Sequence, residues 1–140
     1  MHIEIANALE EVATVVGTLE VFCDNASLEK STAQAAELAL DELLTNIISY
    51  GYVDDSRHKI VIDLEIDSHA LTLLVSDDGI AFNPFEHELP CCEQSVEQLE
   101  PGGHGIRLVK TLMDQCAYQR LEGKNIVTLQ KRLSQPVTRR

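Results

Sequence analysis

The sequence places a carboxylate and an amide four positions apart in an otherwise apolar stretch, LALDELLTNIIS. These residues are Glu42 and Asn46. If the stretch is helical, residues i and i+4 lie on one face, so the two polar groups point in the same direction. Together they could hold a hydrated Mg²⁺, or one could orient a nucleophile while the other binds the metal. The alternative is that both lie on the solvent edge of an amphipathic helix.

A second candidate group directly follows an apolar run, in the segment SDDGIAFNP at 76–84. A carboxylate at a strand end, here Asp77, can accept a hydrogen bond from an exocyclic amine such as N6 of adenine. Gly79 would let the backbone turn and approach a flat ring closely. Asp-Gly is also a common hairpin turn, but no partner strand follows and the chain enters a long irregular segment. This irregular segment spans 81–101, and a loop of about 20 residues in a compact domain is typical of a lid or a binding loop.

Three glycines, Gly102, Gly103 and Gly105, stand just before an apolar helical pattern. The backbone N–H groups at a helix N-terminus attract anions, and glycines let a phosphate come close to them. The alternative is a flexible hinge. A dinucleotide-binding motif is excluded because no strand within a β-α-β unit precedes the glycines, and a P-loop is excluded because no Gly-Lys-Ser/Thr follows.

The elements that must position these groups follow from the spacing of apolar residues. Apolar residues that recur every three or four positions predict three helices. The first is expected to be capped by Asn7. The second is expected to be capped by Ser27 and to end near Gly51. Alternation predicts five strands, of which two form a hairpin around 67–69. The order β-α-α-β-β-α-β-β predicts an α+β fold, a two-layer sandwich of helices on a mostly antiparallel mixed sheet, in one domain over 1–140. The remaining expected bounds are strands at 2–5, 59–66, 71–75, 118–121 and 126–133, with the third helix at 104–115.

Composition narrows the class of protein. The net charge is −12, and no basic stripe that would contact nucleic acid is visible. The sequence contains no run of about 18 apolar residues, the length that a membrane-spanning helix needs. The acidic N-terminus also lacks the apolar core of a secretory signal. The four cysteines show no CxxC spacing, which favours reduced thiols over a disulfide or metal site. We therefore expect a cytoplasmic protein that contacts neither nucleic acid nor membrane directly.

The three motifs in this order, ExxxN, DxGxxF and GGxG, resemble the N, G1 and G2 boxes of the GHKL (histidine-kinase/Hsp90-like) ATP-binding superfamily. That resemblance covers roughly 3–133 and implies the Bergerat-type ATP-binding fold. The stretches ALDELLTNIISYGY and DDGIAFNP are most similar to the anti-sigma-factor serine/threonine kinase branch. Two positions depart from the family pattern: Ala81 stands where a second glycine is common, and Tyr50 where many relatives have histidine.

The resemblance implies a role for each matching residue. Glu42 matches the general base toward the attacking hydroxyl, Asn46 the ligand of Mg²⁺ on the triphosphate, and Asp77 the acceptor of adenine N6. It also implies an ATP lid at 83–103. The nucleotide-binding residues implied are Asn46, Asp77, Gly79, Ala81, Phe82, Gly102, Gly103, His104, Gly105 and Ile106.

The function implied is that of an ATP- and Mg²⁺-dependent protein serine/threonine kinase in transcription regulation. Such a kinase binds a sigma factor and phosphorylates a STAS-type anti-sigma-factor antagonist, and relatives form homodimers. A catalytically inactive, nucleotide-gated protein-binding module is the alternative, and a structural domain without ligand is a third reading. The presence of Glu42 favours the enzyme.

Overall fold

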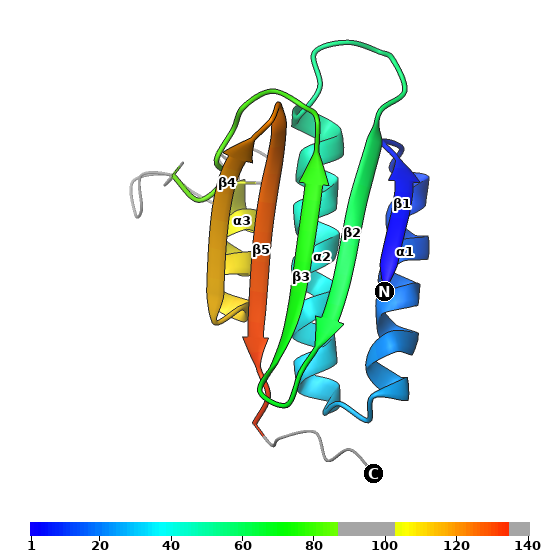
Figure 1. Ribbon diagram of the computed structural model, residues 1–140, viewed down its shortest axis with the longest axis vertical. Helices are drawn as coiled ribbons and strands as arrows, with labels where there is room; N and C mark the ends of the chain where they lie inside the picture. The colour runs from blue at the N-terminus through cyan, green and yellow to red at the C-terminus, as the bar shows by residue number, and fades with distance from the viewer. Residues whose placement is uncertain (87–102, 135–140) are drawn as a thin grey trace.

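The computed structural model describes residues 1–86 and 103–134. Three helices cover one face of a five-stranded sheet and leave the other face open (Figure 1). The predicted element order and the α+β two-layer fold are both confirmed. The elements are β1 (His2–Ala6), α1 (Glu10–Asn25), α2 (Lys30–Tyr50), β2 (Lys59–Ile66), β3 (Ala70–Asp77), α3 (Gly103–Leu112), β4 (Gln115–Leu121) and β5 (Lys124–Arg132).

The strands lie in the order β1-β2-β3-β5-β4, and each of these pairings is antiparallel. The register of β3 with β5 sets Asp77, the last residue of β3, opposite Asn125. The β4–β5 hairpin turns at Glu122 and Gly123, which both have positive φ (51° and 77°), as a two-residue hairpin turn requires. The sheet therefore brings the end of β3 beside the start of β5.

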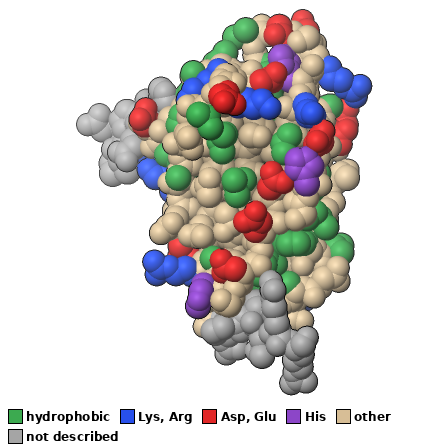
Figure 2. All heavy atoms as spheres, in the orientation of Figure 1, with side chains coloured by type: hydrophobic (Ala, Val, Ile, Leu, Met, Phe, Trp, Pro, Cys, Tyr) green, Lys and Arg blue, Asp and Glu red, His purple; other side chains and the backbone are tan. Residues whose placement is uncertain are grey.

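Alternate strand residues and one side of each helix form the hydrophobic core between the two layers. The open face carries the other strand residues, and there Figure 2 shows acidic, basic and apolar side chains interspersed. Within the described ranges, no helix is both long and apolar enough to cross a membrane. Fully buried side chains of the core include Leu19, Leu40, Leu43, Leu44, Ile60, Ile62, Leu64, Leu71, Leu73 and Leu129.

Both predicted helix caps are wrong. The first helix has Leu9 at its N-cap, because the Asn7 side chain is used elsewhere: its Oδ1 accepts from the backbone N–H of His58 at 2.9 Å. The second helix begins at Lys30, since Ser27 has a φ of 57° and belongs to the preceding turn. These errors arise where a tertiary contact or a turn replaces a local capping bond.

The third helix is shorter than predicted and the strand after it is longer. The helix ends at Leu112, and the backbone N–H of Asp114 donates to the carbonyl of Gln130 at 2.8 Å. Pairing with β5 therefore begins at Gln115. Hydrogen bonds between residues 114–115 and β5 replace the helix that the apolar pattern predicted there.

Candidate functional site

The carboxylate of Asp77 is buried at the end of β3, with 4% of the residue exposed. Its Oδ1 accepts hydrogen bonds from the backbone N–H of Gly79 at 2.8 Å and from Nδ2 of Asn125 at 3.0 Å. Burial raises the pKa of Asp77, and these two hydrogen bonds oppose the rise. Among the described residues both bonds go to Oδ1, so Oδ2 is the oxygen that can accept from a ligand.

Asn125 is a site residue that the sequence reasoning missed. Its Nδ2 also donates to the carbonyl of Ile80 at 2.8 Å, while its Oδ1 accepts from the backbone N–H of Phe82 at 3.3 Å and from the hydroxyl of Tyr118 at 2.5 Å. One buried amide thus binds the carboxylate and both ends of the turn that follows it. The sequence signal was present only as a polar residue in an apolar strand, and its partner lies 48 positions away.

Replacing Asn125 with alanine is expected to lower the free energy of unfolding by about 2–3 kcal/mol, because buried groups lose their partners and one of them is a carboxylate. Urea denaturation would measure this loss. Gln130→Ala is the matched control, since that amide is on the same strand and, among the residues that the structure describes, makes one hydrogen bond, to Thr72 at 3.3 Å. We expect the control to cost no more than about 0.5 kcal/mol; equal losses would contradict the network.

Gly79 is required by a close backbone approach. A Cβ at this position would lie 2.4 Å from the carbonyl oxygen of Gly51, and the same carbonyl accepts from the backbone N–H of Ile80 at 2.9 Å. Arg120 adds a bond from its Nη1 to the Gly79 carbonyl at 2.9 Å. The turn after Asp77 is therefore held against the residue that follows α2, and a position of Gly79 beside an adenine ring stays a prediction.

A buried tyrosine hydroxyl lies near Asp77. The Tyr52 hydroxyl is buried and has no hydrogen-bond partner among the described residues. Burial, together with the charges of Asp77 and Asp78, raises the pKa of Tyr52, so the group remains a donor. Buried polar groups in proteins are nearly always partnered. This donor therefore fits a site that a polar ligand or a water completes.

Glu42 and Asn46 lie on one face of α2, as their spacing predicts, and both are partly buried. Neither side chain makes a hydrogen bond or an ion pair with another described residue. The end of α2 reaches the Asp77 turn through Gly51, and a rise of about 1.5 Å per residue sets Asn46 roughly 8 Å back along the helix axis. The two groups are thus available for a ligand that extends from the turn along α2.

The glycine cluster opens α3, which begins at Gly103 and packs against α2. The N–H groups of the first three residues of a helix lack an intrahelical acceptor, so those of Gly103, His104 and Gly105 have no acceptor within α3 and can face an anion. The Ile106 side chain itself is buried in the core. Gly102 and most of the predicted lid at 83–103 lie outside the described residues.

Exposed apolar side chains lie on the two segments that meet at the Asp77 turn, the end of α2 and the residues after the turn. Tyr50 at the end of α2, and Ile80 and Phe82 after the turn, are 48%, 43% and 39% exposed. Ala81 between them is also exposed. Ligand sites are lined mainly by apolar and aromatic side chains with a few polar groups, so these residues and Asp77 are candidates for one binding site. Ile80, Ala81 and Phe82 follow the Asp77 turn, and the turn is bonded to Gly51, the residue after Tyr50. Glu42 and Asn46 lie farther back on α2, and the glycines open α3.

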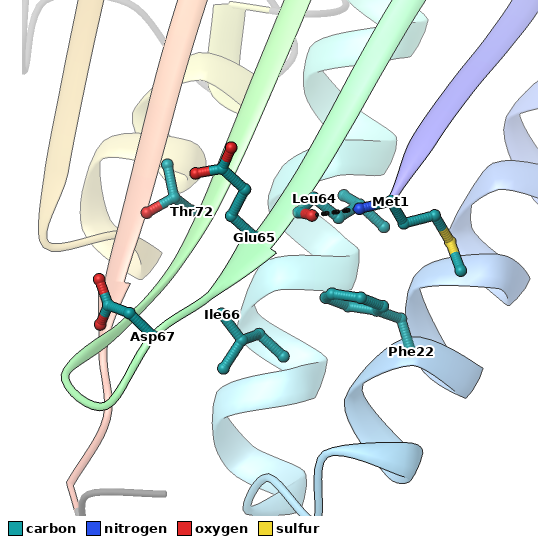
Figure 3. Close-up of a pocket in the computed structure, with 7 residues that line it drawn as sticks. All are labelled: Met1, Phe22, Leu64, Glu65, Ile66, Asp67 and Thr72. Atoms are coloured by element: carbon teal, nitrogen blue, oxygen red, sulfur yellow. Dashed lines mark hydrogen bonds between the residues drawn. The ribbon is translucent and has the colours of Figure 1, made fainter.

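A separate cavity of about 410 Å³ lies at the other end of the sheet, beside the β2–β3 turn (Figure 3). The N-terminal amine of Met1 donates to the carbonyl of Leu64 at 2.7 Å there. This cavity contains none of the predicted site residues. It is lined by Met1, Phe22, Leu64, Glu65, Ile66, Asp67 and Thr72.

Comparison with known families and proteins matches the chain over most of its length. The family model described as the histidine kinase-like ATPase domain matches residues 5–131. The serine/threonine-protein kinase BtrW of Bordetella bronchiseptica is 34% identical over 92 residues, covering 66% of this chain and 65% of that protein. The anti-sigma F factor of Clostridium novyi is 30% identical over 95 residues, 66% of each chain.

A longer alignment and a solved structure agree with these matches. The serine-protein kinase RsbW of Bacillus mycoides is 25% identical over 136 residues, covering 91% of this chain and 81% of that protein. The histidine kinase domain of the blue-light activated histidine kinase EL346 from Erythrobacter litoralis superposes with a TM-score of 0.50 and 24% identity. That superposition covers 74% of this chain and 46% of the other, and it bears on the fold alone.

Proposed function

The chain belongs to the histidine kinase-like ATPase domain family, and we propose that it is an ATP-dependent protein serine/threonine kinase of the anti-sigma-factor type. The observation that carries the proposal is the buried Asp77 carboxylate, with Oδ1 bonded to Gly79 and Asn125 and Oδ2 left for a ligand. Adenine offers an amine to such an acceptor. The kinase names of the relatives from Bordetella and Bacillus support the activity.

The residues present fit an adenine nucleotide at one end and a triphosphate beyond it. Asp77 would accept from the adenine amine, and the buried Tyr52 hydroxyl supplies a donor nearby. Asn46 would hold Mg²⁺, which supplies positive charge against the phosphates when bound. The N-terminus of α3 would provide backbone N–H groups to the same phosphates.

Glu42 would orient or deprotonate the hydroxyl of the protein substrate. Phosphoryl transfer depends mainly on positioning and charge stabilisation, so a single carboxylate beside the phosphate residues is sufficient for this role. We propose a STAS-type antagonist as the phosphate acceptor and a sigma factor as the second partner, with the nucleotide state deciding which is bound. The name of the Clostridium relative supports the sigma-factor partner. We also propose a homodimer, which analytical ultracentrifugation would test.

Millimolar ATP with Mg²⁺ is expected to raise the melting temperature of the protein. A ligand that binds only the folded state adds about 2.7 kcal/mol of stability at a hundredfold excess over its dissociation constant. Differential scanning fluorimetry would measure the shift, with GTP as the control nucleotide because it lacks the amine that Asp77 would bind. The absence of any shift would overturn the nucleotide site itself.

Turnover is tested separately with radiolabelled ATP and a STAS-domain protein. Transfer of label to a serine or threonine of that protein supports the kinase. ATP binding without transfer to any acceptor would instead favour a nucleotide-gated binding module.

A further inference from the structure

A histidine outside the predicted site joins the loop after α2 to the turn after β3. His58 is the residue before β2. Its Nδ1 lies 3.0 Å from Oδ1 of Asp78, the neighbour of Asp77, and its Nε2 lies 2.9 Å from Oδ1 of Asp54 in the loop after α2. The imidazole therefore links the loop between α2 and β2 to the turn that carries Asp77.

Only the imidazolium form can make both contacts as hydrogen bonds. A neutral imidazole has one N–H and one lone pair, and a lone pair facing a carboxylate is repelled. The hydrogen bond with Asp54, followed by that with Asp78, raises the pKa of His58. The geometry and the charges therefore favour the ring with a proton on each nitrogen.

The ring is held on its other sides as well. The Tyr52 ring stacks on it with centroids 4.5 Å apart and planes 21° apart, and the backbone N–H of His58 donates to Asn7. Tyr52 carries the buried hydroxyl that has no partner within the described part of the chain, so the stack also positions that donor. The groups facing the imidazole are thus Asp54, Ser56 and Tyr52 from the loop and Asp78 from the end of β3. The adjacent Lys59 pairs with Glu4 on β1.

We infer that His58 is a positioning residue for the nucleotide, because its doubly protonated ring fixes the Asp77 turn and the Tyr52 hydroxyl relative to the end of α2. The inference rests on the proposed ATP site. His58 touches neither Asp77 nor the expected position of the phosphates, so it acts through Asp78 and Tyr52.

After loss of one proton the ring can donate to only one of the two carboxylates, and the Ser56 hydroxyl, whose Oγ lies 3.0 Å from Nε2, can donate to the ring only by giving up its bond to Asp54. Asp54 also accepts from the backbone N–H and the hydroxyl of Ser56. The hydroxyl of Ser56, the ring of His58 and the backbone N–H of Ser56 together lower the pKa of Asp54 to about 2. The carboxylate of Asp78 accepts from His58 alone among the described residues. The bridge is therefore complete below the ordinary histidine pKa of 6.5 and is lost as the pH rises through the raised pKa of His58.

The test is the dissociation constant of ATP·Mg²⁺, measured calorimetrically from about pH 6 to about pH 9. Over this pH range, we expect the dissociation constant of the unchanged protein to rise about two- to fivefold more than the dissociation constant of His58→Gln. His58→Arg should retain the tight level throughout, because guanidinium stays charged, donates to both carboxylates and stacks on Tyr52. The titration of ATP itself is common to all variants and cancels in the comparison.

His2→Gln is the matched control, because His2 also contacts two carboxylates, those of Glu4 and Asp63, on the β1 edge. It should show the pH slope of the unchanged protein. A His58→Gln slope equal to that of the unchanged protein would overturn the inference. Absence of ATP binding at every pH would instead overturn the proposed function.

A further variant keeps the inference testable if His58→Gln does not fold. Asp78→Asn retains an acceptor but removes one charge that raises the pKa of His58, so the loss of affinity should begin at a lower pH. An unchanged midpoint in Asp78→Asn would count against the bridge.

Discussion

Replacing Asp77 with asparagine is expected to weaken ATP binding by about two orders of magnitude and to raise the stability of the free protein. The loss has a direct cause: an asparagine amide can present a donor where the carboxylate Oδ2 would accept the adenine amine, and a mispaired buried polar group is costly. The asparagine oxygen can still accept from Gly79 and Asn125. The turn should therefore keep its shape while its ligand specificity is lost.

The gain in stability follows from the raised pKa of Asp77. As the pH rises, the carboxyl ionises first in the unfolded chain, near its ordinary value of 3.8. Stability therefore falls until the folded carboxyl has ionised too, and the penalty is constant above that pH. The asparagine variant avoids this penalty, so at neutral pH we expect a gain of about 0.5–2 kcal/mol, as for other groups kept for function.

Thermal melts of both proteins, with and without ATP·Mg²⁺, test the two effects together. Asp77→Asn should melt at a higher temperature without nucleotide and show no shift with it. Asp41→Asn is the control, because its carboxylate is exposed on α2 and accepts from Thr45, and it should retain binding within about fivefold. An ATP-dependent shift that survives in Asp77→Asn would contradict the assignment of the adenine acceptor.

Replacing Glu42 with glutamine is expected to slow phosphoryl transfer by about 10²- to 10⁴-fold, the contribution of a positioned general base. Glutamine keeps the size and the hydrogen-bonding oxygen but cannot take the proton of the attacking hydroxyl. Because the Glu42 side chain makes no hydrogen bond or ion pair with another described residue and glutamine has the same size, the protein should remain folded. ATP binding should also persist within a small factor.

The measurement is single-turnover transfer of label from ATP to a STAS-domain acceptor, with nucleotide affinity measured alongside. Asp41→Asn is the matched control: it removes the adjacent carboxylate, which is exposed and accepts from Thr45 at 3.2 Å. That variant should transfer phosphate at nearly the unchanged rate. Transfer that is equally fast in Glu42→Gln would remove this residue from the role of base.

The sequence determined the order of the elements and where its polar groups stand within them. Both follow from the spacing of apolar residues, which repeats every two residues in strands and every 3.6 residues in helices. Glu42 and Asn46 share a face of α2 as their spacing requires. Asp77 stands at a strand end because an apolar alternating run precedes it. The fold class and the family likeness were therefore readable from the chain.

Only the tertiary structure decided which distant residues complete the site. Asn125 meets Asp77 because the β3–β5 register sets them opposite each other. His58 meets Asp78, and Asn7 meets His58, through contacts between separate elements. The predicted cap at Asn7 failed for the same reason, since a local motif cannot anticipate a competing distant partner. Hydrophobic periodicity specifies which face of an element is buried, whereas the pairing of polar groups depends on register and on where loops meet.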